Sequence, residues 1–195
     1  MTISFQSLGM LRTKVKVSQI TNLSEARYCA GMGVDFLSFP ISSIDSKTFK
    51  EITSWVAGPK FGIEVDLNNI DRVNEYEADF IQLPFDLLDH ISVGNVAVPL
   101  IHLHEWSLAK TKLISLKSQI LFLEIVDSPL NPKEELVLHE MANDFELVMH
   151  LSNASEIDRI LNLPIAGIRL EGGAEQRPGL KDYPLAEILE TLEHE

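Results

Sequence analysis

The 195-residue chain has one cysteine, few basic side chains and no long hydrophobic run, and each shortage excludes a class of protein. The single cysteine, Cys29, cannot form an internal disulfide, which fits a reducing, cytoplasmic compartment, and we expect a buried, unreactive thiol. Lysines and arginines number 16 against 29 aspartates and glutamates, and the net charge of −13 repels nucleic acid and anionic membranes. No apolar run approaches the ~20 residues of a membrane helix, and we see no signal-peptide pattern.

The residues that are present predict one globular domain over residues 1–195, in which short apolar runs alternate with longer amphipathic ones. The expected strands are Lys14–Ile20, Asp35–Pro40, Phe61–Leu67, Phe80–Phe85, Pro99–His104, Leu121–Asp127, Glu146–Leu151 and Gly167–Glu171. The expected helices are Ser24–Met32, Ser46–Val56, Ile70–Tyr76, Leu87–Ser92, Ser107–Ser118, Lys133–Asn143, Ser155–Leu161 and Leu185–Leu192. Eight strand–helix units favour a closed parallel (β/α)8 TIM barrel of minimal size over an open α/β sheet.

Two stretches carry a resemblance to a known family: Lys16-Val17-Ser18-Gln19-Ile20-Thr21, and residues 172–182, which read Gly-Gly-Ala-Glu-Gln-Arg-Pro-Gly-Leu-Lys-Asp. They resemble phosphoribosylanthranilate isomerase, which opens with Lys-x-Cys-Gly-Ile/Leu-Thr and carries Ser-Gly-Val-Glu-x-x-Pro-Gly-x-Lys-Asp near its C-terminus. The resemblance implies a (β/α)8 barrel and the Amadori isomerisation of phosphoribosylanthranilate in tryptophan biosynthesis. It also implies a small phosphorylated metabolite as partner, and we expect a monomer or a homodimer.

The resemblance also implies roles for two residues. The family's general base is the first-strand cysteine and its general acid is the sixth-strand aspartate; these positions are Ser18 and Asp127 here. A serine hydroxyl has no accessible anionic form near neutral pH unless another base activates it. Asp127 can still act as the acid, or it can simply cap the turn in its Asp-Ser-Pro segment. We therefore expect the isomerase activity to be weak or lost.

Other departures from the family concern the ligand. Gln19 replaces the glycine after the cysteine, and the arginine segment after the second strand is absent. Two of the three phosphate loops have lost their glycines, and Glu171 stands where a carboxylate would repel a phosphate. The remaining candidates for phosphate binding are Gly172, Gly173, Ser152 and Asn153.

Strand alternation predicts which polar side chains face the barrel interior. The polar members of the inward-facing set are Lys16, Ser18, Glu64, Asp66, Gln82, His102, His104, Asp127, Arg169 and Glu171, and Ile125 is predicted to face inward with them. Buried charges must be paired, and we expect Glu64 to bridge Lys16 and Arg169. That role would be structural rather than catalytic.

His102 and His104 are candidates for a replacement general base, as is Asp66. The two histidines can equally be hydrogen-bonded pore residues. With Glu124, Asp127 or His150 they could form a metal site, although we expect no metal and no cofactor. Three functions remain open: isomerisation with Asp127 as acid and a histidine or Asp66 as base; a non-catalytic paralogue that acts in binding or assembly; and a different reaction on the same barrel.

Overall fold

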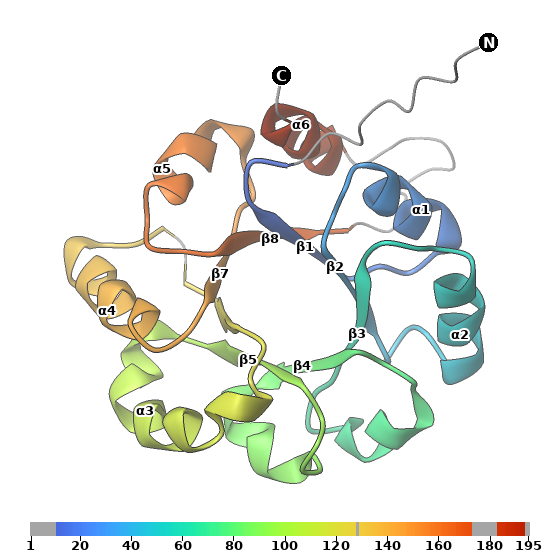
Figure 1. Cartoon of the computed structure of the whole chain (residues 1–195), viewed down its shortest axis with the longest axis horizontal. Coiled ribbons are helices and arrows are strands. Elements are labelled where there is room, and N and C mark those ends of the chain that lie inside the picture. The colour runs from blue at the N-terminus through green and yellow to red at the C-terminus, as the bar shows by residue number, and fades with distance from the viewer. Residues whose placement is uncertain (1–10, 128, 173–182, 194–195) are drawn as a thin grey trace.

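The computed structural model describes residues 11–127, 129–172 and 183–193. Eight parallel strands close into a barrel in chain order, with the helices outside it (Figure 1). The strands are β1 (Lys14–Ser18), β2 (Phe36–Pro40), β3 (Lys60–Glu64), β4 (Phe80–Pro84), β5 (Ala97–Ile101), β6 (Leu123–Ile125), β7 (Leu147–His150) and β8 (Gly167–Glu171). The pairing of β1 with β8, from Lys14↔Gly167 to Ser18↔Glu171, closes the ring. The predicted (β/α)8 fold is confirmed.

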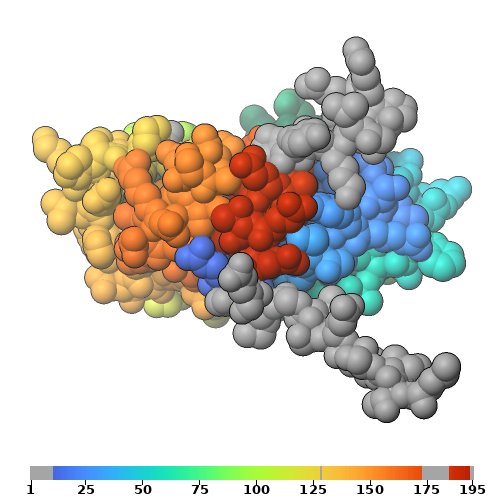
Figure 2. Space-filling view, turned by 90° about the horizontal axis from the view of Figure 1, so that it is seen from above, coloured from blue at the N-terminus to red at the C-terminus, as the bar shows by residue number. Residues whose placement is uncertain are grey.

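The connections between the strands differ in kind. The α-helices are α1 (Leu23–Gly31), α2 (Ser46–Ser54), α3 (Trp106–Ser115), α4 (Pro132–Ala142), α5 (Ile157–Leu161) and α6 (Tyr183–Leu192). The 3-10 helices are η1 (Ile70–Glu75), η2 (Phe85–His90), η3 (Leu103–Glu105), η4 (Lys117–Gln119) and η5 (Ala154–Glu156). The predicted helices after β3 and β4 are thus 3-10 helices of six residues each. The last helix, α6, lies between α5 and α1 (Figures 1 and 2).

Asparagine and aspartate side chains cap several of the helix starts. The side chains of Asn22, Asp45 and Asn131 accept hydrogen bonds from the first turns of α1, α2 and α4, and Asn153 does so for η5. Asn69 is the exception, because its side chain accepts from the backbone N–H of Asp66 instead. Among the described residues, no helix is long and apolar enough to cross a membrane.

An aromatic cluster fills the N-terminal end of the barrel interior. The ring of Phe36 packs edge-on against those of Phe80 and Phe122, with centroids 6.0 Å and 5.2 Å away. Gly62 on β3 leaves the space that Phe80 occupies, because a Cβ atom there would overlap the Phe80 ring. This apolar floor places the polar interior, and any open space, toward the C-terminal ends of the strands.

Cys29 is buried on α1, as expected. Burial raises the pKa of its thiol to about 12, and Glu25 adds to that effect. A thiol with such a pKa carries almost no thiolate at neutral pH, so it is chemically inert in the folded chain.

Candidate functional site

A polar cavity of about 490 Å³ opens at the C-terminal ends of the strands. Its charged and amide lining comprises Gln19, Glu64, Asp66, Asn69, Gln82, Arg169 and Glu171. In (β/α)8 barrels this face carries the binding and catalytic residues, so the cavity is the candidate site. Three carboxylates face one guanidinium here, and the cavity is therefore acidic.

Beneath the cavity lies a fully buried ion pair that the alternation rule missed. The Lys16 ammonium donates to Glu124 Oε2 at 2.9 Å, and their side chains are 0% and 2% exposed. Lys16 also donates to Ser18 Oγ and to Gln82 Oε1. The other carboxylate oxygen of Glu124 lies 3.3 Å from Arg169 Nη1. Glu124 is therefore the carboxylate that bridges the two cations.

The prediction that Glu64 bridges Lys16 and Arg169 is wrong. Within the described ranges no ion pair joins Glu64 to either residue; Arg169 pairs with Glu124 and with Glu171, at 2.8 Å in the second case. Alternation failed on β6, where Ile125 was placed inward. This strand has only three residues and all are buried, so burial does not distinguish its two faces.

A second signal could have corrected that assignment. Phe122 belongs to the interior cluster with Phe36 and Phe80, and Glu124 is two residues beyond it. The aromatic residue at the floor therefore indicates which residues of β6 face inward. On β3, Glu64 is likewise two residues beyond Gly62 at the floor, and on β4, Gln82 is two residues beyond Phe80.

Glu64 instead holds the turn that follows β1. Its Oε1 accepts from the backbone N–H of Gln19 at 2.7 Å and from Ser38 Oγ at 2.7 Å, while Oε2 accepts from the Gln19 side-chain amide. Gln19 has φ of 62°, a left-handed conformation that suits glycine. The Glu64 carboxylate fixes this backbone conformation of Gln19.

Ser18 is at the end of β1 but does not reach the cavity. The residue is 0% exposed, and its hydroxyl oxygen accepts from Lys16 and, at 3.4 Å, from Ser38. Neither partner is a carboxylate or an imidazole that could remove the hydroxyl proton. Its carbonyl oxygen accepts the backbone N–H of Gly172 at 2.7 Å.

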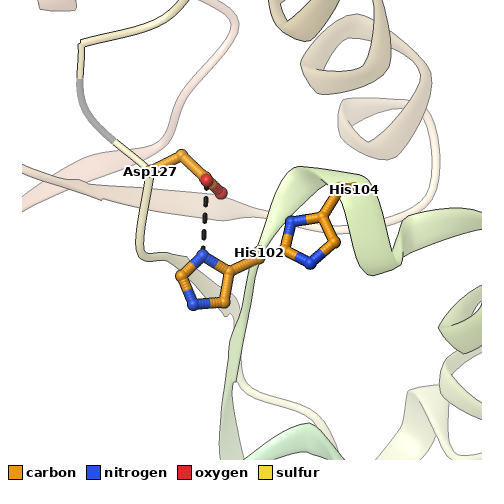
Figure 3. Close-up of side chains that lie close together, drawn as sticks. All are labelled: His102, His104 and Asp127. Carbon is orange, nitrogen blue, oxygen red and sulfur yellow. Dashed lines mark hydrogen bonds and ion pairs between the residues drawn. The ribbon is translucent and has the colours of Figure 1, made fainter.

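Asp127 lies at the other side of the barrel rim, just after β6. Its Oδ2 accepts the backbone N–H of Leu103 at 2.7 Å, and its Oδ1 is 3.3 Å from His102 Nδ1 (Figure 3). The strand β5 ends at Ile101, so His102 and His104 belong to the turn at η3. The prediction that both histidines point into the barrel is wrong, because both lie beyond the end of β5 and neither lines the cavity; the His102 side chain is 45% exposed and His104 is also exposed.

Asp66 is the one predicted catalytic residue that lines the cavity. It is exposed, and its Oδ1 accepts the backbone N–H of Asn68 at 2.8 Å. Neither Ser18, Asp127, His102 nor His104 contributes to the cavity wall. The structure therefore does not bring the predicted acid and base residues together around one space.

The predicted phosphate residues lie along the β7 and β8 ends. The Gly172 N–H is used by Ser18, and Asn153 caps η5 through its hydrogen bond with the Ser155 N–H at 2.9 Å. Ser152 is exposed, and Gly173 lies outside the described residues. The nearby His150, at the end of β7, is half-buried; burial lowers its pKa and the charge of Arg169 lowers it further.

Comparisons with known proteins support the fold. No protein-family model matches the sequence, and no curated protein matches it. The structure is similar to phosphoribosyl anthranilate isomerase from Thermus thermophilus, with a TM-score of 0.70 and 15% identity over 92% of this chain and 98% of that one. The phosphoribosyl anthranilate isomerase from Thermotoga maritima has a TM-score of 0.68 and 15% identity, over 92% of this chain and 96% of that one.

Two further similar structures define how far this likeness reaches. A phosphoribosyl anthranilate isomerase in complex with reduced 1-(o-carboxyphenylamino)-1-deoxyribulose 5-phosphate has a TM-score of 0.68 and 16% identity, over 92% and 98% of the chains. Thiamine phosphate pyrophosphorylase from Pyrococcus furiosus has a TM-score of 0.62 and 14% identity, over 93% of this chain and 94% of that one. The likeness is therefore one of fold, shared by enzymes with different reactions.

Proposed function

We propose that this chain is an isomerase-like (β/α)8 barrel that binds a small polar molecule in its C-terminal cavity, and that isomerisation of phosphoribosylanthranilate is weak or lost. The observation that carries the proposal is the position of Ser18. Its hydroxyl is fully buried and does not line the cavity, and within the described part of the chain its partners are the Lys16 ammonium and the Ser38 hydroxyl, neither of which can remove its proton. A proton on a bound substrate has no base at that position.

The electrostatics of the cavity support the same conclusion. Glu64, Asp66 and Glu171 outnumber Arg169, and Arg169 is already paired with Glu171 and Glu124. An anionic phosphate entering this space meets net repulsion. A neutral or amine-bearing polar ligand is favoured over a phosphorylated one.

The decisive experiment is complementation of a tryptophan auxotroph that lacks the isomerase, with isomerase assays of the purified chain alongside. We expect no growth, and no tight binding of reduced 1-(o-carboxyphenylamino)-1-deoxyribulose 5-phosphate by calorimetry. Robust growth with the unaltered chain would overturn the proposal. The variant Ser18→Cys should not restore full activity, because a thiol there is buried and the phosphate loops still lack their glycines.

A residual isomerase is the second candidate function, and one observation favours it: Asp66 is exposed in the cavity wall, where it could serve as a replacement base. If the unaltered chain did support growth, Asp66→Asn should abolish it, since an amide cannot accept the proton. The matched control is Asp71→Asn on η1, which does not line the cavity. Equal growth of both variants would exclude Asp66 as the base.

A further inference from the structure

Two histidines and an aspartate converge at the barrel rim, outside the cavity. His102 and His104 come from the turn after β5, and Asp127 follows β6, its neighbour in the sheet (Figure 3). One nitrogen of each imidazole and one carboxylate oxygen all lie within 4.8 Å of one another. Among residues 11–127, 129–172 and 183–193, this is the single group of three such side chains with that spacing.

The distances suit a metal ion. Ligand atoms about 2.0–2.2 Å from a tetrahedral Zn²⁺ lie roughly 3.4 Å from one another. His102 Nδ1 and Asp127 Oδ1 are 3.3 Å apart, so this pair already has the separation of two ligands on one ion. The largest separation in the group, 4.8 Å, must close by about 1.4 Å. His104 is exposed, and side-chain rotation can supply that movement.

The surroundings hold two of the ligands in place and leave room for more. The Leu103 N–H donates to Asp127 Oδ2, which orients the carboxylate and leaves Oδ1 facing the histidines. The backbone N–H of His102 donates to Glu105 Oε2 at 2.8 Å, which fixes the start of the turn. The exposed side of the group leaves coordination positions for water or a ligand. The net charge of −13 also attracts a dication.

We propose that His102, His104 and Asp127 form a binding site for a divalent transition-metal ion, with Zn²⁺ as the best match. Two imidazoles and one carboxylate are ligands that Zn²⁺ and its first-row neighbours accept, and three protein ligands with an open position are typical of reactive rather than structural zinc sites. The site does not depend on the proposed function, because none of the three residues lines the cavity. A metal on Asp127 would hold the carboxylate ionised, and it could not then donate a proton as a general acid.

The test is a titration of the chelator-treated full chain with ZnCl2, by calorimetry and equilibrium dialysis. We expect one Zn²⁺ per chain with a dissociation constant in the micromolar range or below. Removing one ligand should weaken binding about 10–100-fold or more, so His104→Ala and Asp127→Asn are the test variants. His139→Ala is the matched control, because His139 is exposed on α4 and outside the group.

Two further measurements distinguish a built site from surface binding. Co²⁺ should give the visible absorption of a low-coordinate ion with the unaltered chain and lose it in His104→Ala. Zn²⁺ should raise the melting temperature of the unaltered chain and of His139→Ala but not of Asp127→Asn, since binding to the folded state alone stabilises it. If His104→Ala, His139→Ala and the unaltered chain bind Zn²⁺ equally well, the ion is held by scattered surface groups and the proposal is wrong.

Discussion

Replacing Glu124 by glutamine removes the carboxylate that, among residues 11–127, 129–172 and 183–193, contacts both Lys16 and Arg169. Lys16 would then keep a fully buried charge with no counterion in the described part of the chain, since its other acceptors there are the neutral oxygens of Ser18 and Gln82. Removing one partner of a buried ion pair typically costs about 3–5 kcal/mol. We expect a loss of that size for Glu124→Gln, and with a urea m-value of about 2 kcal/mol/M the midpoint should fall by about 1.5–2.5 M.

Urea denaturation followed by circular dichroism measures this loss, and Glu64→Gln is the matched control. Among the described residues Glu64 accepts hydrogen bonds from neutral donors and pairs with no cation. Glu64→Gln should therefore lower the free energy of unfolding by less, about 1–3 kcal/mol. The double variant Lys16→Met/Glu124→Gln should be more stable than Glu124→Gln alone, because the unpaired ammonium is gone. The assignment of Glu124 as the bridge would be refuted by a loss below about 1 kcal/mol for Glu124→Gln. A greater loss of stability for Glu64→Gln than for Glu124→Gln would refute it as well.

Three further predictions concern single sites. Cys29 should not react with a thiol reagent at pH 8 in the folded chain and should react fully in urea; rapid reaction in the native state would contradict its burial and its pKa of about 12. Gly62→Ala should lower the free energy of unfolding by about 1–3 kcal/mol, since the methyl group overlaps Phe80, and an unchanged urea midpoint would show that the ring moves freely. Folding lowers the pKa of His150 below its unfolded value of about 6.5. Between the folded and the unfolded pKa the unfolded chain binds more protons than the folded chain, so stability should fall as pH falls through this window. His150→Gln should flatten that slope in urea titrations at several pH values, and an identical slope would assign it to other groups.

The sequence predicted the barrel well because each strand is a distinct apolar run bounded by polar turns. Strand β8 has the predicted bounds, Gly167–Glu171, and α2 starts at the predicted Ser46. Prediction was weaker where the runs are short. The strand predicted as Pro99–His104 is β5, Ala97–Ile101, and this shift moves His102 and His104 from the pore to the rim.

The candidate site was harder to predict for a physical reason. Side-chain direction on a strand with both faces buried depends on one residue of register, and the three residues of β6 give no alternation to fix it. The alternation rule therefore places Ile125 rather than Glu124 in the interior and predicts Glu64 as the bridge. The proximity of Asp127 to His102 joins two strand ends 25 residues apart, which the pairing of β5 with β6 brings together.

The contact between Gln19 and Glu64 makes these two positions epistatic. Glu64 accepts from both the backbone and the side chain of Gln19, across 45 positions of sequence. A change of Gln19 to glycine alone would relieve a left-handed residue but leave one carboxylate oxygen of Glu64 without that side-chain donor. A change of Glu64 alone would leave Gln19 in a strained conformation that nothing holds. The effect of a change at one position therefore depends on the residue at the other, and the pair is expected to persist or to be lost together as related sequences diverge.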